Sequence, residues 1–382
     1  MRPAEASLAV PRSGPLPDSE PVVCSYNEWD PLEEVIVGTA QGAVQSAYEP
    51  ATAPFVKSRD SGEREFRGKP FPAEEIARAE RQLDGLAELL ESEGATVRRP
   101  EPLDHDVSVR TPEFDCERGH AQTCPRDVLL VVGDEIIEAS MAQRSRFFEY
   151  RSYRPLLKEY FKRGARWSAA PKPTMSDDLY VMDYDASVAG YDFSTHPSLT
   201  EFEPCFDAAC FSRMGRDIFW QPDIVSNQFG ADWLARHLGD DYRIHKLEFE
   251  DHHPHHIDAT MVPLRPGLLL TNPARPAKGD CLRVFEENDW QIVDVVPSAR
   301  QQRSATALEV SSWISMNILS VDERKVVVDE QEKPFIAQLE SLGCEVLAIP
   351  FDAVFQFGGS FHCCTADIRR NGTLESYFPS LD

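Results

Sequence analysis

A thiol follows two glycines near the end of the chain, in the segment Phe357–Thr365. Gly358 and Gly359 let the backbone turn sharply or approach a ligand closely. Cys363 lies just beyond them. A cysteine has an ordinary pKa of about 8.5, and a cationic neighbour shifts it toward the nucleophilic thiolate. Because free cysteines are also often small buried hydrophobic residues, this segment suits either a nucleophile or a core position.

Four histidines stand between Asp251 and Asp258. A histidine beside a carboxylate suits general acid–base catalysis, because its ordinary pKa is about 6.5. The same cluster could instead be a solvated polar loop or a histidine-rich tract that binds a metal. Since the chain lacks the Cys-x-x-Cys and His-Glu-x-x-His spacings of zinc sites, we expect no metal ion.

Two further segments, Glu201–Cys210 and Thr123–Asp127, place acidic residues among apolar or small neighbours. Asp207 stands between Phe206 and Ala208, where an unpaired buried carboxylate would be costly. We expect it either to cap a local turn or to pair with a cation. A pair of buried carboxylates suits a planar guanidinium, which presents five donors in a fixed fork.

The elements that must position these residues follow one pattern five times: two short β-like runs, a helical run and a further β-like run. In the first helical run, Leu83, Leu86 and Leu90 continue one helical face that starts at Ile76. The predicted units are Val22–Ser25, Glu34–Val37, Glu74–Ser92 and Thr96–Arg99; Asp127–Val132, Glu135–Ala139, Arg144–Arg163 and Arg166–Ala169; Asp217–Trp220, Ile224–Ser226, Ala231–Leu238 and Tyr242–Phe249; Met261–Leu264, Leu268–Thr271, Cys281–Glu287 and Gln291–Val296; and Ile318–Val321, Lys325–Asp329, a helix through Phe335, Leu339 and Leu342, and Glu345–Ile349.

Five such units can close into a ring that leaves no free edge. Irregular segments rich in Asp, His, Ser or Cys follow the closing strands, and equivalent loops of a ring meet at its axis. We therefore expect an α/β fold of five ββαβ modules with pseudo-fivefold symmetry and the active site on the axis. An open α/β sheet in two domains is the alternative.

The composition excludes several classes of protein. The 382 residues include 39 Lys and Arg against 64 Asp and Glu, a formal charge of −25 that makes nucleic acid and membrane surfaces poor partners. Hydrophobic residues make up 42%, enough for a packed interior, and nine cysteines are too sparse for a disulfide framework. We expect residues 1–20 to be a flexible leader, residues 21–382 to be one domain, and the protein to be cytoplasmic.

Long segments of the chain resemble the amidinotransferase family, and within it the glycine-type enzymes. The segments are Ser25–Gly38, Arg144–Arg151, Ala170–Met175, Glu201–Ala209, His256–Thr260 and Phe361–Cys363. The resemblance implies the five-module α/β propeller (pentein) of guanidine-modifying enzymes. It also implies transfer of an amidino group from L-arginine to a primary amine, with release of L-ornithine, a covalent amidino-cysteine intermediate and ping-pong kinetics.

The same resemblance assigns roles to the acidic, histidine and thiol clusters. Cys363 aligns with the family's nucleophile, and His256 aligns with its acid/base. Asp207 matches the carboxylate that partners the histidine and the guanidinium. Asp127 and Asp258 match two further carboxylates that hold the guanidinium.

Two positions match residues that bind a substrate carboxylate in the family. Arg275 matches the arginine that binds it, and Ser311 or Ser312 falls where a serine assists. No metal or organic cofactor is implied. The implied partners are small molecules, L-arginine and an amine. The resemblance to the glycine-type enzymes also implies a second copy of the chain in a homodimer.

Some residues depart from the glycine-type pattern. Cys210 stands where those enzymes have Asp and the inosamine-phosphate enzymes have Asn. His255 replaces an apolar residue before His256, and Ser360 and Cys364 differ beside the nucleophile. These changes are either neutral or reshape the acceptor pocket for lysine, another amino acid or an aminocyclitol. A sizeable insertion over Val181–Leu199 favours the glycine type.

Two other functions use the same residues. A deiminase-like hydrolase would keep the cysteine, histidine and carboxylates but would let water, rather than an amine, complete the reaction. A non-catalytic protein that binds arginine would need the carboxylates and not the thiol. Citrulline release without amine would indicate the hydrolase, and arginine binding that survives Cys363→Ala without a phenotype would indicate the binding protein.

Overall fold

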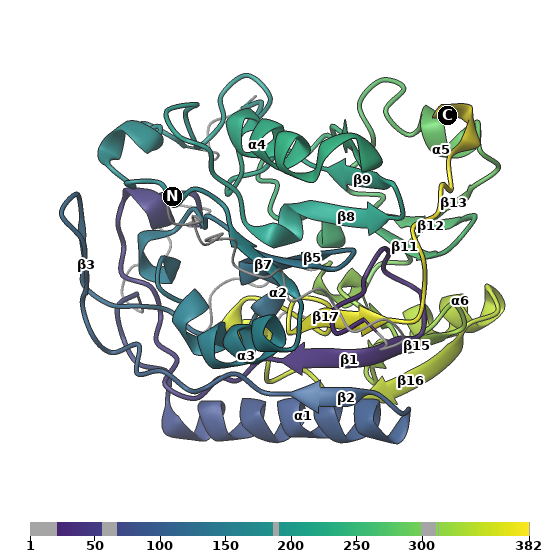
Figure 1. Ribbon diagram of the computed structural model, residues 1–382, viewed down its shortest axis with the longest axis horizontal. Helices are drawn as coiled ribbons and strands as arrows, with labels where there is room; N and C mark the ends of the chain where they lie inside the picture. Colours follow the sequence, from purple (N-terminus) through teal and green to yellow (C-terminus); the bar gives the residue numbers. More distant parts are fainter. Residues whose placement is uncertain (1–20, 56–66, 186–190, 299–310, 312, 382) are drawn as a thin grey trace, which may run out of the picture.

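Figure 1 shows the chain as a computed structural model, which describes residues 21–55, 67–185, 191–298, 311 and 313–381. The expected leader, residues 1–20, lies outside these ranges. Within them, five three-stranded sheets and one two-stranded sheet form, and no sheet closes on itself. None of the helices in this part of the chain combines the length and the apolar character needed to cross a bilayer.

The second unit shows the topology that all five three-stranded sheets share. β5 (Leu129–Val132) and β6 (Glu135–Glu138) form an antiparallel hairpin, and Gly133 makes its tight turn at a φ of 58°. α3 (Tyr150–Lys162) follows, and β7 (Arg166–Ala169) then pairs parallel with β6. The ββαβ unit predicted from the sequence is therefore confirmed at the level of strand pairing.

Three more units repeat this topology along the chain. Their elements are β8 (Phe211–Met214), β9 (Asp217–Trp220), α4 (Gln228–Leu238) and β10 (Arg243–Lys246); β11 (Met261–Arg265), β12 (Leu268–Thr271), α5 (Arg283–Glu286) and β13 (Gln291–Asp294); and β14 (Leu319–Ser320), β15 (Lys325–Asp329), α6 (Lys333–Ser341) and β16 (Glu345–Ile349). The predicted strand Ile224–Ser226 is wrong. Asp223 accepts hydrogen bonds from the Val225 N–H and the Ser226 hydroxyl, and these bonds fold the segment into a turn.

The first unit joins the two ends of the described chain. β1 (Leu32–Val37) pairs antiparallel with β17 (Thr365–Arg370) and parallel with β2 (Thr96–Arg98). In Figure 1, purple β1 lies next to yellow β17. The prediction that Val22–Ser25 is the first strand of this unit is therefore wrong. That segment makes only isolated β-bridges, because β17 occupies the edge of β1.

α1 (Ala73–Ser92) buries the helical face that the sequence predicts. Leu83, Leu86 and Leu90 are fully buried, while Ile76 at the start of the face is only partly buried. The helix lies along the first sheet and contacts β1 and β2. Gly94, at a φ of 97°, ends the helical segment and lets the chain turn into β2.

Short elements complete the described part of the chain. They are η1 (Pro50–Phe55), β3 (Val109–Arg110), β4 (Asp115–Cys116), α2 (Pro125–Val128), η3 (Arg144–Arg146), η4 (Asp177–Leu179), η5 (Ala208–Cys210), η6 (Gly239–Asp241), η7 (Ile257–Ala259), η8 (Ile314–Met316), η9 (Phe355–Phe357) and η10 (Pro379–Leu381). Two of them correct predicted bounds. The strand expected from Asp127 starts after α2, and the helix expected from Arg144 starts only after η3.

Candidate active site

A turn before the first strand of each unit carries one polar side chain. Asp127 lies in α2 before β5, and Asp207 directly precedes η5 and β8. Asp258 lies in η7 before β11, and Asn317 stands between η8 and β14. Cys363 lies in the turn before β17. Equivalent positions in five units therefore supply one candidate residue each.

These five turns contact one another in succession. α2 contacts η5, η5 contacts η7, and η7 contacts η8. Asn317, after η8, accepts a hydrogen bond from the backbone N–H of Cys363 at 3.0 Å. The Cys363 carbonyl in turn accepts the backbone N–H of Arg126, in α2, at 3.3 Å. The series of contacts between the turns therefore returns to α2, where it began.

A cavity of about 630 Å³ opens among these turns. The predicted site residues on its wall are Asp127, His255, His256, Asp258, Arg275, Ser311 and Cys363. Asp207 is fully buried and does not belong to this wall, but its Oδ2 lies 3.4 Å from His256 Nε2. The folded chain therefore brings together residues that are as far apart in sequence as Asp127 and Cys363.

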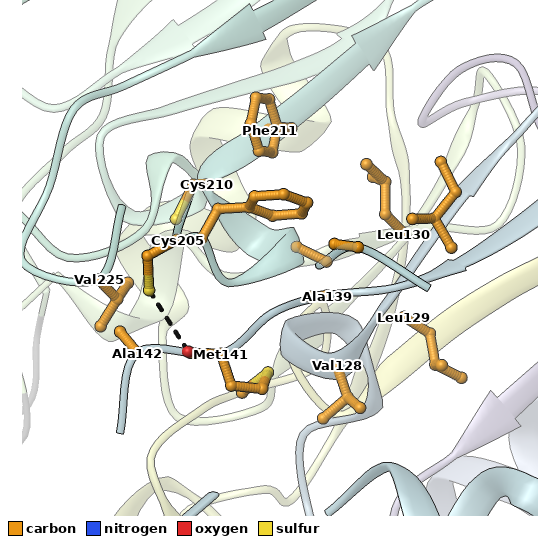
Figure 2. Packing of buried hydrophobic residues seen from close by; sticks show 14 of the residues in the cluster. Val128, Leu129, Leu130, Ala139, Met141, Ala142, Cys205, Cys210, Phe211 and Val225 are labelled. Carbon is orange, nitrogen blue, oxygen red and sulfur yellow. Dashed lines mark hydrogen bonds between the residues drawn. The ribbon is translucent and has the colours of Figure 1, made fainter. Parts of the chain in front are cut away.

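The loop that carries Asp207 is fixed to the second unit. The Cys205 thiol donates a hydrogen bond to the Met141 carbonyl at 3.4 Å, the dashed line in Figure 2. The backbone N–H of Ala142 donates to Asp207 Oδ1 at 3.1 Å. Apolar side chains from both units, including Val128 and those labelled with it in Figure 2, pack around this loop. Burial and these bonds hold Asp207 in one position.

Asn317 holds the candidate nucleophile on two sides. Its Nδ2 donates to Cys363 Sγ at 3.2 Å, while its Oδ1 accepts the backbone N–H groups of Cys363 and Ser360. Burial, followed by the charges of Asp258 and Asp127, raises the pKa of the Cys363 thiol well above its usual range. Burial therefore favours the thiol form of Cys363 over the thiolate.

His256 lies between two carboxylates in a strained backbone conformation. Its φ is 53°, and its backbone N–H donates to Asp223 Oδ2 at 2.8 Å. Its Nδ1 lies 3.6 Å from Asp127 Oδ1, and its Nε2 faces Asp207. Burial lowers the pKa of His256, but Asp127 and Asp207 outweigh it and raise the pKa to about 9. The imidazole is thus an acid near neutral pH.

Arg146 balances the charge of the carboxylates, a role the sequence did not indicate. Its Nη1 donates to Asp127 Oδ2 at 2.8 Å and lies 3.5 Å from Asp207 Oδ2, and Glu149 holds its other side. The opposite oxygen, Asp127 Oδ1, is buried and accepts no hydrogen bond from the described residues. Asp127 lines the cavity, but this oxygen is itself covered and lies 3.6 Å from His256 Nδ1, so a ligand N–H would satisfy it only by taking the place of that contact.

Asp258 touches the candidate nucleophile and is ionised. Its Oδ2 lies 3.5 Å from Cys363 Sγ and 2.8 Å from Nδ1 of His362, whose Nε2 reaches Glu28 at 3.2 Å. Burial raises the pKa of Asp258, but the bond and charge of His362 outweigh it and lower the pKa. His362, which the sequence did not single out for a role, therefore keeps a carboxylate charged beside the sulfur.

Arg275 and Ser311 both reach the cavity wall. Arg275 is held by Asp251 at 2.7 Å and by the Ala259 carbonyl at 3.0 Å, so its head group is fixed in place. The Ser311 hydroxyl accepts the Trp313 N–H at 3.2 Å. Ser312, the alternative to Ser311, lies outside the described residues.

Of the four departures from the glycine-type pattern, Cys210, His255, Ser360 and Cys364, only His255 lies on the wall of this cavity. Its ring centroid is 4.0 Å from that of His256. Cys210 is fully buried and absent from the wall, so direct contact with a substrate is not expected. Its thiol donates instead to Asp223, at 3.3 and 3.4 Å from the two oxygens. Cys210 therefore contacts the carboxylate that holds the His256 backbone.

Two sets of described residues have ligand atoms close enough to hold a metal ion. They are Asp127, His256 and Cys363, and Cys210, Asp223 and His256, with atoms within 4.8 Å of one another. Thiolate and imidazole ligands would suit zinc. However, a nucleophile beside an acid/base and its carboxylate needs the same residue types. The absence of a metal therefore stays a prediction.

No protein-family model matches the chain. Curated relatives do. The chain is 48% identical over 356 residues to an L-arginine:L-lysine amidinotransferase of Pseudomonas savastanoi pv. phaseolicola, covering 93% of this chain and 96% of the relative. It is 44% identical over 392 residues to the mitochondrial glycine amidinotransferase of Danio rerio, covering 98% of this chain and 89% of that protein.

Two solved structures agree. SxtG, an amidinotransferase from Microseira wollei in the saxitoxin biosynthetic pathway, is 43% identical with a TM-score of 0.83. The inosamine-phosphate amidinotransferase StrB1 from Streptomyces griseus is 38% identical with a TM-score of 0.84. Each match covers 94% of this chain and 100% of the other. The fold and these relatives define a transferase of amidino groups. The chain belongs to the amidinotransferase family, and it is therefore a transferase.

Proposed function

We propose that the protein transfers the amidino group of L-arginine to a primary amine through a covalent adduct on Cys363. The observation that supports it best is the cluster on one cavity wall: the Cys363 sulfur, the His256 imidazole and the carboxylates of Asp127 and Asp258. Nucleophile, acid and acceptors for a guanidinium are the groups that this reaction needs. No cofactor enters the proposal.

Arginine binding would use the two ends of the substrate. The guanidinium donates to Asp127 Oδ1, where it takes the place of the contact with His256 Nδ1, and faces Asp258. Arg275, fixed by Asp251, binds the α-carboxylate at the other end with help from Ser311. The positive charge of the guanidinium offsets the two carboxylates that raise the pKa of Cys363. Binding of the substrate therefore favours the thiolate form of the nucleophile.

The transfer then needs one proton carrier. As arginine binds, the Cys363 thiol releases its proton to solvent, and the thiolate attacks the guanidinium carbon to give a tetrahedral adduct. His256, already protonated, then gives its proton to the departing nitrogen, the C–N bond breaks and ornithine leaves. The neutral imidazole next removes a proton from the incoming amine, whose attack releases the new guanidine and the thiolate. Because Asp127 and Asp207 raise the pKa of His256 to about 9, the imidazole carries the proton needed for the first step. Alternating half-reactions predict ping-pong kinetics.

Glycine is the acceptor we propose first, on the glycine-type resemblance and the insertion over Val181–Leu199. Lysine, another amino acid or an aminocyclitol is the alternative, since relatives at similar identity are named for glycine and for lysine. His255 is the departure from the glycine-type pattern that lies on the cavity wall. A polar, half-buried imidazole there would favour an acceptor with a further polar group over glycine.

An assay of ornithine formation separates these acceptors. Arginine is incubated with glycine, lysine, 4-aminobutyrate or an aminocyclitol in turn. The proposal expects ornithine only when an effective amine is present, and His255→Leu should change the KM for that amine but not the half-reaction with arginine. Steady citrulline release without amine would instead support the hydrolase, and no product with any amine would count against transfer.

We also propose that the five units surround a pseudo-fivefold axis in one domain, the α/β propeller implied by the resemblance. The closed succession of contacts from α2 through η5, η7 and η8 to Cys363 and back supports it. So does the position of one polar residue before the first strand of each unit. A homodimer stays a prediction of the family resemblance, and light scattering of the purified protein tests it.

A further inference from the structure

Cys124 is a buried thiol on the same cavity wall as Cys363, and the transfer steps above give it no role. It stands at the N-terminal end of α2, directly before Pro125. It contacts a third thiol, that of Cys364, through a side-chain hydrogen bond. Three thiols therefore meet at the candidate nucleophile, although they come from two distant parts of the sequence.

Gly359 keeps the space between two of these thiols open. A Cβ on Gly359 would lie 2.4 Å from Cys363 Cβ and 2.9 Å from Cys124 Sγ, both shorter than real contacts, and 3.2 Å from Cys363 Sγ, which is tight. Both sulfurs therefore lie next to the space that a side chain at position 359 would occupy. The backbones are tied as well, since the Arg126 N–H donates to the Cys363 carbonyl. A disulfide would require a movement of the side chains that brings the two sulfurs to about 2 Å from each other.

We propose that Cys124 is a resolving thiol, which forms a disulfide with Cys363 when a hydroperoxide oxidises the nucleophile. In the first step the thiolate fraction of Cys363, which has given its proton to solvent, attacks the peroxide; an S–O bond forms, the O–O bond breaks, and the leaving oxygen takes up a proton, so that a sulfenic acid and an alcohol or water form. In the second step the Cys124 sulfur attacks the sulfenyl sulfur. The S–S bond forms, the S–O bond breaks, and the hydroxyl group leaves as water with the Cys124 proton.

The overall step is balanced, because two thiols lose two electrons and two protons and the peroxide gains them. The disulfide stops further oxidation of Cys363 to the irreversible sulfinic acid, and a dithiol can reduce it again. Both cysteines line the cavity, so a small peroxide that enters it comes close to them. The thiol chemistry itself does not depend on transfer, but the expected loss of activity rests on the proposed function.

The test treats the full-length protein with a low excess of hydrogen peroxide and maps its peptides without reduction. The wild type should lose two hydrogens in mass and yield a cross-linked peptide pair that contains Cys124 and Cys363, and dithiothreitol should restore its activity. Cys124→Ser should instead accumulate sulfenic and then sulfinic acid at Cys363 and stay inactive after dithiothreitol. Cys364→Ser is the matched control and should behave as the wild type does.

Two results would overturn the inference: a wild-type protein without the Cys124–Cys363 cross-link, or a cross-link from Cys124 to Cys364 alone. The wild-type mapping needs no variant, so misfolding of Cys124→Ser would not obscure either result. If the cross-link forms in a protein without transferase activity toward any amine, then the proposed function fails and the resolving role of Cys124 stands.

Discussion

Asp223 holds His256 from behind: its Oδ2 accepts the His256 backbone N–H at 2.8 Å, at a position where φ is 53°. A non-glycine residue keeps such a φ only when its surroundings fix it. The Cys210 thiol donates to the same carboxylate, which adds a second layer of support. In this chain the carboxylate behind His256 therefore comes from Asp223, and position 210 supports it with a thiol.

Asp223→Ala should therefore misplace the His256 imidazole, the proposed acid/base. We expect kcat to fall by roughly 100-fold, since small misplacements of a catalytic group have effects of this size. KM for arginine should change little, because Asp223 does not line the cavity. Steady-state kinetics measures both, with the exposed Asp240→Asn as the control. A variant with normal kcat would show that the bond does not position His256.

Asn317→Ala should weaken the hold on the nucleophile. The variant loses the Nδ2–Sγ bond of 3.2 Å and the acceptor of two backbone N–H groups around Cys363. We expect a fall of about 100-fold in the rate of adduct formation with arginine alone. Rapid-quench mass spectrometry follows that step, and the surface variant Asn371→Ala should match the wild type. Equal rates in both variants would contradict the role of Asn317.

Arg146→Met should lower the stability of the fold. The change leaves the buried carboxylates of Asp127, Asp207 and Glu149 without their shared cation. Removal of one partner of a buried ion pair typically costs about 3–5 kcal/mol. Urea unfolding measures it, and Arg166→Met, whose ion pairs involve a side chain that is 60% exposed, should cost at most about 1 kcal/mol. Similar losses in both variants would be inconsistent with this account.

His256 should make stability depend on pH. Because the folded-state pKa of about 9 exceeds the ordinary value, its pairing with Asp127 and Asp207 stabilises the fold fully below about pH 6.5 and is lost as the pH rises through 9. The loss should be on the order of 3 kcal/mol. Urea unfolding at pH 6.5 and pH 9.5 should show a smaller decrease for His256→Gln than for the wild type. Parallel decreases would exclude a raised pKa for His256.

The sequence predicts much of the fold because most units consist of local signals. β7, β15 and β16 have the predicted bounds, since each is a short β-like run beside a turn or helix. The pairing of β1 with β17 was missed because it joins the two ends of the chain, and no local pattern specifies a partner so distant. The turn at Ile224–Ser226 was missed because its polar bonds come from Asp223.

In the candidate site, too, local sequence patterns indicate some residues and not others. Cys363 and His256 stand in distinctive segments, whereas Asn317 and Arg146 acquire meaning only through their contacts in the folded chain. One signal could have found Asn317, since it precedes the first strand of its unit as Asp127 and Asp258 precede theirs. A comparison of the five units with one another would have made that position visible.

The central claim is that the Cys363 sulfur takes the amidino group from arginine. The direct measurement is the intact mass of the protein, quenched in acid after incubation with L-arginine alone, followed by peptide mapping. The account predicts a gain of one amidino group on the Cys363 peptide and one ornithine released per adduct, with the adduct lost when an effective amine is added. An unchanged mass, with the protein folded and arginine bound, would contradict it.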